Sequence, residues 1–170
     1  MTGQREYLTC NQLWKRFHKA DERRSELYYK WKRLVHELHD NELRINLVKD
    51  AINAIHKKKD PDKLSFLDQD RLNFYHKELE KLKAHSAELH CLIIHNKEVC
   101  EEATVRANRY KMAWNKLKDI AVHNLPEEIE TMQDRTNFID FYTCSVLTEE
   151  SGRLHIVTHG DDCHEIEFHF

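Results

Sequence analysis

A long repeat of apolar residues constrains this chain more than any other feature. From residue 13 to residue 55, apolar side chains recur at alternating steps of four and three, and only Arg24 and Asn41 break the pattern. A sustained period of about 3.5 residues places these side chains on one stripe of a helix that packs against another helix. The stripe consists of Leu13, Phe17, Ala20, Arg24, Leu27, Trp31, Leu34, Leu38, Asn41, Ile45, Val48, Ile52 and Ile55.

A second stripe with the same spacing begins at residue 72 and ends at residue 121. Its members are Leu72, Tyr75, Leu79, Leu82, Ser86, Leu89, Ile93, Asn96, Cys100, Ala103, Ala107, Tyr110, Trp114, Leu117 and Ala121. The two stripes predict helices at about residues 9–57 and 65–122. Thr9 and Gln12 have the spacing of a capping box at the first helix, and either Asp60 or Ser65 can cap the second.

Two helices of similar length joined by a short segment predict an antiparallel coiled-coil hairpin over residues 9–123, following a tail at residues 1–8. If Ile55 faces Leu72, Asn41 falls opposite Ser86, so the two polar side chains can hydrogen-bond each other. The same register places Asn96 opposite Trp31. We therefore expect one register to be favoured over its alternatives.

The apolar surface is wider than the two stripes require, since further large apolar residues flank each of them. This width is typical of a four-helix bundle, formed by dimerisation or with a partner. The predicted protein-binding residues are Trp14, Tyr28, Trp31, Val35, Leu92, Val99, Ile166, Phe168 and Phe170.

The period changes after about residue 136. Residues 138–147, 154–159 and 163–170 are rich in aromatic and β-branched residues, and Ile166, Phe168 and Phe170 alternate with polar residues. These segments predict a small three-stranded antiparallel β-meander at residues 137–170, after a linker with a short helical turn at residues 124–136. The fold class is therefore mainly α, with the meander at its C-terminal end.

Charge and composition restrict the functions that the chain can have. The 27 Lys and Arg residues nearly balance the 30 Asp and Glu residues, which disfavours general nucleic-acid binding. A local basic segment, Lys57, Lys58 and Lys59, remains a candidate for phosphate contact. With three glycines in total, the chain has no phosphate-binding glycine-rich loop, and it has no HExxH helix.

The C-terminal histidines and cysteines are candidate zinc ligands. His155, His159, Cys163 and His164 lie close in sequence, but strand alternation distributes them over both faces of a sheet, whereas a structural zinc site needs four convergent ligands. We therefore predict no metal, no cofactor and no catalytic residues.

The N-terminus has no apolar stretch of the signal-peptide type, and no segment approaches the roughly 20 apolar residues of a membrane span. We expect a cytoplasmic or nuclear protein without membrane insertion. Its predicted function is that of a protein-binding or scaffold subunit, acting through the heptad helices and the C-terminal β segment with a protein partner or as a homodimer. The alternatives are a nucleic-acid-associated adaptor that uses the basic loop and first helix, and a Cys/His metal protein or enzyme.

Overall fold

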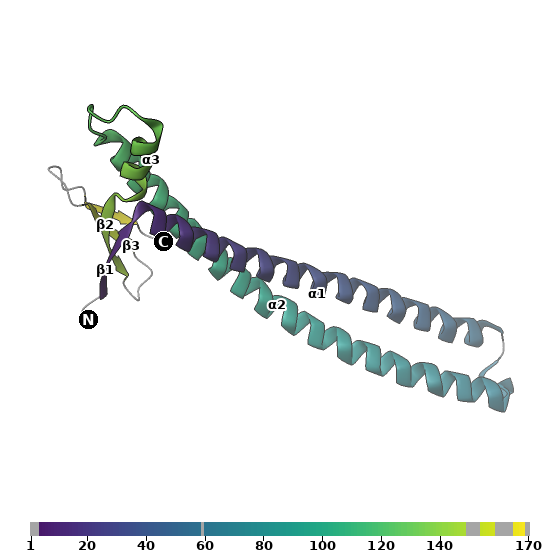
Figure 1. Cartoon of the computed structure of the whole chain (residues 1–170). Coiled ribbons are helices and arrows are strands. Elements are labelled where there is room, and N and C mark those ends of the chain that lie inside the picture. Colours follow the sequence, from purple (N-terminus) through teal and green to yellow (C-terminus); the bar gives the residue numbers. More distant parts are fainter. Residues whose placement is uncertain (1–3, 59, 149–153, 159–164, 169–170) are drawn as a thin grey trace. The chain divides into compact units, whose positions relative to one another are not determined.

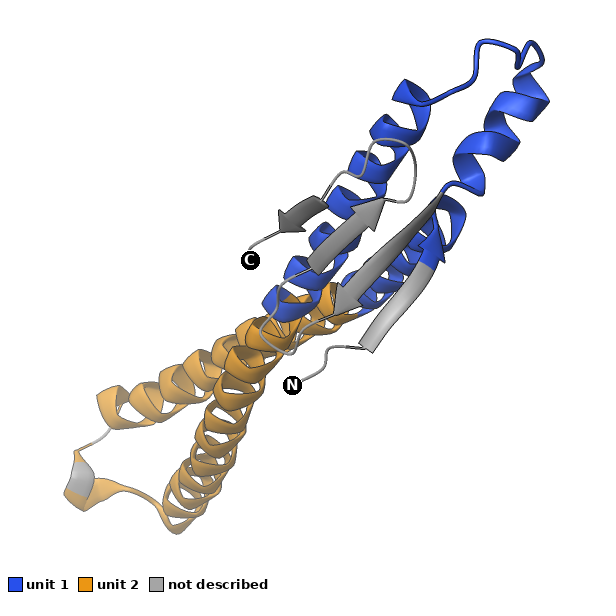
Figure 2. Ribbon diagram, turned by 90° about the vertical axis from the view of Figure 1, so that its left-hand side faces the viewer, with its two compact units in different colours: residues 1–26, 101–170 blue, residues 27–100 orange. Residues whose placement is uncertain are grey.

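The computed structural model describes residues 4–58, 60–148, 154–158 and 165–168, with side chains at residues 8–58, 60 and 62–142. Its described part is mainly helical, with two long helices and a short one. The chain forms two compact units, residues 1–26 with 101–170 and residues 27–100 (Figure 2). Both long helices contribute residues to each unit.

Helix α1, Cys10–Lys58, and helix α2, Phe66–His123, pack against each other as a hairpin (Figure 1). Each of their four ends differs by one residue from the end expected from the apolar stripes. Every position of the two predicted stripes is buried or half-buried. The stripes are therefore the seam along which the helices meet, and this prediction is confirmed.

The N-terminus of α1 is closed by a capping box. The Thr9 amide donates to Gln12 Oε1 at 2.9 Å, and the Gln12 amide donates to Thr9 Oγ1 at 3.2 Å. These bonds satisfy two backbone donors that have no partner within a helix. The predicted capping box is confirmed.

Ser65, rather than Asp60, caps α2. The Asp68 amide donates to Ser65 Oγ at 3.2 Å, and the Ser65 hydroxyl donates to Asp68 Oδ2 at 2.8 Å. Asp60 instead precedes the short 3₁₀ helix η1, Pro61–Lys63, whose Lys63 amide donates to the Asp60 carbonyl at 2.9 Å. Proline fits the first position of η1 because no amide hydrogen is needed there.

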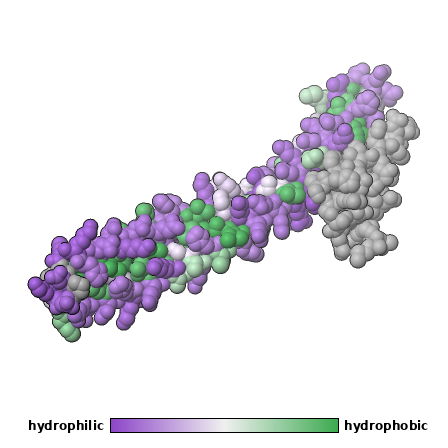
Figure 3. All heavy atoms as spheres, turned by 180° about the vertical axis from the view of Figure 1, so that it is seen from behind, coloured by the Kyte–Doolittle hydropathy of each residue, from purple (hydrophilic) through white to green (hydrophobic). Residues whose placement is uncertain are grey.

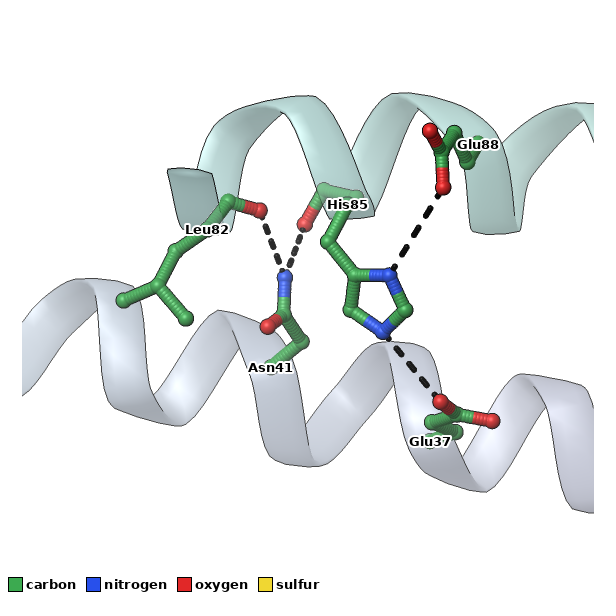
Figure 4. A network of polar contacts seen from close by, with 6 residues as sticks. Glu37, Asn41, Leu82, His85 and Glu88 are labelled. Atoms are coloured by element: carbon green, nitrogen blue, oxygen red, sulfur yellow. Dashed lines mark hydrogen bonds and ion pairs between the residues drawn. The ribbon is translucent and has the colours of Figure 1, made fainter. Parts of the chain in front are cut away.

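One buried polar layer fixes the alignment of the two helices in the unit of residues 27–100. Asn41 is 4% exposed, and its Nδ2 donates to Ser86 Oγ and to the Leu82 carbonyl, each at 2.8 Å (Figure 4). The predicted pairing of Asn41 with Ser86 is confirmed. A shift of one helix along the other would leave these buried groups without partners, so the layer penalises other registers.

The prediction of a three-stranded C-terminal β-meander is wrong. Among the residues that the structure describes, the sheet has four antiparallel strands in the order β1-β2-β3-β4. They are β1 Gln4–Thr9, β2 Thr143–Thr148, β3 Leu154–Thr158 and β4 Glu165–Phe168. The added strand comes from residues predicted as an N-terminal tail, and it pairs with β2 in a register that sets Leu8 opposite Cys144.

The tail prediction failed because β1 is stabilised by a distant partner. Its six residues include Gln4, Arg5 and Glu6, so they lack the apolar alternation that marks a strand. Backbone hydrogen bonds to β2 do not depend on that alternation. The sequence therefore contains little evidence for this strand.

The predicted first strand also began too early, since residues 132–140 form helix α3, Met132–Asp140. Thr131 caps this helix, and its Oγ1 accepts a hydrogen bond from the Asp134 amide at 3.1 Å. Phe138, expected in a strand, lies in this helix. The helical turn expected at residues 124–136 therefore falls later in the chain and is longer than expected.

A small core holds the first unit together. Leu8, Cys10, Leu13, Ala113 and Leu117 form its buried cluster. Tyr110, Trp114, Ile139 and Tyr142 pack against this cluster. The Cys10 amide also donates to the Tyr142 carbonyl at 3.0 Å, which ties the start of α1 to the segment before β2.

We predict that Ser86→Ala lowers the free energy of unfolding by about 1 kcal/mol, because the buried Asn41 Nδ2 loses one of its two acceptors. Urea denaturation followed by circular dichroism measures the change. Ser25→Ala is the matched control, since Ser25 is half-buried but outside the seam. Equal stability of the two variants would contradict a role for the Asn41 layer.

Candidate protein-binding surface

The two flanks of the hairpin can be told apart by one cross-helix contact. In heptad notation the seam residues occupy positions a and d, and positions e and g lie to either side of them. Glu37 of α1 and His85 of α2 are both g residues, and Glu37 Oε1 lies 3.2 Å from His85 Nε2. The two g rows therefore share one flank of the unit of residues 27–100, and the two e rows share the other.

The g flank is polar around Glu37 and His85. His85 Nδ1 also lies 4.0 Å from Glu88 Oε2, so the imidazole lies between two carboxylates (Figure 4). Lys30 and Asp40 are exposed on the same flank. Leu92, a predicted binding residue, is 47% exposed there, and Val99 is half-buried.

The e flank has a different character. Tyr28 and Val35 of α1 occupy e positions and are 43% and 38% exposed, and Ile94 of α2, at the adjoining b position, is 60% exposed. The e and b positions around them hold Lys32, His39, His90 and Lys97, all exposed. We call these seven residues the apolar–basic flank. Of them, sequence reasoning named Tyr28 and Val35 and missed Ile94.

Trp31 lies in the seam rather than on a flank. It is half-buried, and its ring centroid lies 6.1 Å from that of Tyr28. Its indole nitrogen is buried and has no hydrogen-bond partner among the described residues. By the register that Asn41 sets, Trp31 faces Asn96, whose Nδ2 donates within its own helix to the Leu92 carbonyl at 2.8 Å. Because Trp31 belongs to the contact between the two helices, a charged residue at this position would destabilise the fold, and its effect on partner binding could not be read separately.

The residues next to the loop carry exposed apolar side chains that were not predicted. Leu47 of α1 is exposed, as are Phe66, Leu67 and Phe74 of α2. These residues could have been found from the sequence, because each is a large apolar residue that lies in a predicted helix but outside the apolar stripe. Figure 3 shows apolar side chains reaching the surface among polar ones along the hairpin.

The basic loop has a simpler explanation than phosphate binding. Lys57 and Lys58 are exposed in the last turn of α1, where cations interact favourably with the helix dipole. Lys59 lies outside the described residues. Asp60 and Asp62 follow directly and are exposed, which weakens any local positive field.

In the unit of residues 1–26 and 101–170, Trp14, a predicted binding residue, is 40% exposed. Its ring centroid lies 4.0 Å from that of His18. Cys10 is buried in the core, and burial, reinforced by the nearby Asp140 carboxylate, raises its pKa to about 11. The thiol is therefore protonated at neutral pH and is a poor nucleophile.

The remaining candidate residues lie in the C-terminal part of the chain. The backbones of Ile166 and Phe168 lie in β4, and that of His155 lies in β3 opposite Glu167. Phe170, His159, Cys163 and His164 lie outside the described residues. Among the residues that the structure describes, no group of three or more His, Cys, Asp or Glu could hold a metal ion.

Comparison with family models, curated proteins and solved structures gave no match to this chain. None of the helices in the described part is long and apolar enough to cross a membrane.

We predict that iodoacetamide at about pH 8 alkylates Cys91 at least tenfold faster than Cys10. Cys91 is exposed, whereas Cys10 is buried and its raised pKa keeps the thiol protonated. Peptide mass spectrometry at successive times gives both rates in one sample. The same reaction in urea is the control, and it should bring the two rates close together. Equal rates in the folded protein would show that the Cys10 core opens readily.

Proposed function

We propose that this chain is a protein-binding or scaffold subunit that joins a larger assembly through the flanks of its hairpin. The observation that carries the proposal is the exposure of large apolar side chains on helices whose seam is already filled. Each helix uses its a and d positions for the other helix, so the exposed residues are additional to what the hairpin needs. Exposed apolar surface of this kind marks interaction sites.

The exposed residues are numerous and occur on both helices of the unit of residues 27–100. They include Tyr28, Tyr29, Val35, Leu43, Leu47, Phe66, Leu67, Phe74, Leu92 and Ile94. Further helices packed along such flanks convert a two-helix coil into a bundle and remove these side chains from water. The partner that supplies those helices is another protein or a second copy of the chain.

The Asn41 layer supports a specific binding surface. Because Asn41 bonds to both Ser86 and Leu82, each exposed residue of α1 keeps a fixed neighbour on α2. A surface that is ordered before binding loses less entropy when a partner docks. The polar layer thus contributes to recognition although its residues are buried.

The nucleic-acid alternative has weaker support. The chain carries a net charge of −3, and the exposed Lys57 and Lys58 are followed by carboxylates. Exposed aliphatic residues such as Val35, Leu92 and Ile94 do not contribute to phosphate contact or base stacking. These features favour a protein partner.

We predict that affinity capture from a lysate of the source organism retains a stoichiometric protein after a high-salt wash, because apolar burial is not screened by salt. The triple variant Tyr28→Glu, Leu92→Glu and Ile94→Glu should lose at least about 90% of that protein, because each new carboxylate would be buried without a partner in an apolar contact.

The matched control places the same charges at exposed f positions, which point away from both flanks, as His36→Glu, Ala84→Glu and Cys91→Glu. Circular dichroism should show that both variants keep their helices. Retention of nucleic acid alone, lost at high salt, would replace the proposal with the nucleic-acid adaptor.

A further inference from the structure

We infer that the apolar–basic flank binds an amphipathic helix of a partner protein whose apolar stripe is bordered by Asp and Glu. The inference rests on the proposed function and names the chemistry of the partner. It concerns the e and b positions at residues 28–39 of α1 and 87–97 of α2.

The apolar part of the flank has the spacing that a docked helix requires. Tyr28 and Val35 are seven residues apart, so they lie two turns from each other on one side of α1. Ile94 adds an exposed side chain from α2 on the same flank. A helix laid along the hairpin contacts such residues with anchors at its positions i, i+3 or i+4, and i+7.

The charges of the flank select the partner. Lys32 and Lys97 are exposed, and neither has an ion pair among the described residues. His39 and His90 add positive charge when they are protonated. The e and b positions of these segments contain no Asp or Glu, and the next e and b positions along the flank hold Glu42 and Glu101. Carboxylates that border a partner's apolar stripe would pair with Lys32 and Lys97.

The opposite flank shows that this distribution is not a general property of the hairpin. There Glu37 and Glu88 lie on either side of His85, and Asp40 lies 3.9 Å from His36 Nε2. At this level the g and c positions hold Glu37, Asp40 and Glu88 together with Lys30 and Arg33, whereas the e and b positions hold Lys32 and Lys97 without a carboxylate. An acidic helix is therefore attracted more strongly to the apolar–basic flank than to the g flank.

A second copy of the chain fits this flank poorly. A two-fold symmetric dimer places the same patch on both sides of the interface, so the flank that carries Lys32 and Lys97 would meet a flank with the same cations. Like charges brought together in this way lower affinity. A nucleic acid would satisfy the cations but would leave Val35 and Ile94 without apolar contacts.

The test is a selection from a display library of helical peptides about three heptads long. All peptides carry Leu at the a and d positions, and their e and g positions are randomised among Glu, Lys and Gln. The full chain is the immobilised target. We expect the enriched peptides to carry Glu at the flanking positions, and the best of them to bind about tenfold more tightly than the same peptide with Lys at those positions.

Three variants locate the binding. Val35→Glu with Ile94→Glu should reduce enrichment at least tenfold. Leu92→Glu, which introduces the same charge at a comparably exposed residue of the g flank, should leave it unchanged. Lys32→Glu with Lys97→Glu should reverse the preference, so that peptides with flanking Lys are enriched.

Several outcomes would overturn the inference. The first is that the natural chain enriches basic or uncharged peptides. The second is that Val35→Glu with Ile94→Glu enriches the acidic peptides as strongly as the natural chain does. The third is that the natural chain enriches no peptide more strongly than this double variant does. A dimer of the natural chain in light scattering that Val35→Glu dissociates would assign the flank to a second copy. RNA binding lost in Lys32→Glu with Lys97→Glu would assign it to nucleic acid.

Failure of the inference can be separated from failure of the proposed function. If the lysate still yields a stoichiometric, salt-resistant protein and its retention is insensitive to Val35→Glu with Ile94→Glu, the chain is a protein-binding subunit that uses another surface. If neither experiment yields a protein or peptide, both proposals fail together.

Discussion

The seam between α1 and α2 is the contact on which the other features of the hairpin depend. Leu27, Ile45, Ile52, Leu72 and Leu89 provide its buried apolar side chains in the unit of residues 27–100, and Asn41 provides its polar layer. Apolar packing alone would tolerate a shift by one heptad, because the repeat looks similar after seven residues. The bonds from Asn41 to Ser86 and Leu82 penalise such shifts. Stability thus comes mainly from the leucines and isoleucines, and the choice of register comes from one amide.

A fixed register gives the flanks their identity. Because the helices are aligned, Glu37 lies beside His85 on one flank, and Tyr28 and Val35 share the other flank with Ile94. On the first flank His85 lies between two carboxylates, whereas the second presents apolar and cationic side chains together. A shift by one heptad would leave each residue on its own flank but would change which residues of the other helix lie beside it. The proposed recognition of a partner helix is therefore a consequence of the alignment that the buried layer sets.

The other unit depends on contacts between residues far apart in sequence. Strand β1 precedes α1 directly and pairs with β2, which lies more than 130 residues later. The core beneath it joins Leu8 and Leu13 from the start of the chain to Ala113 and Leu117 from the end of α2. The bond from the Cys10 amide to the Tyr142 carbonyl strengthens the same connection. The antiparallel hairpin makes these contacts possible, because α2 runs back along α1 and brings its C-terminal end to the start of α1.

The sequence by itself determined the local features and those with a regular period. The apolar repeat located both helices to within one residue, the spacing of Thr9 and Gln12 gave the first cap, and counting from the loop paired Asn41 with Ser86. Each of these depends on helical geometry, which is the same in every protein. The tertiary structure decided the fourth strand, the choice of Ser65 as a cap and the helix at residues 132–140. It also brought Ile94 to the same flank as Val35. These features depend on backbone pairing or on which faces meet, and such contacts leave no periodic pattern in the sequence.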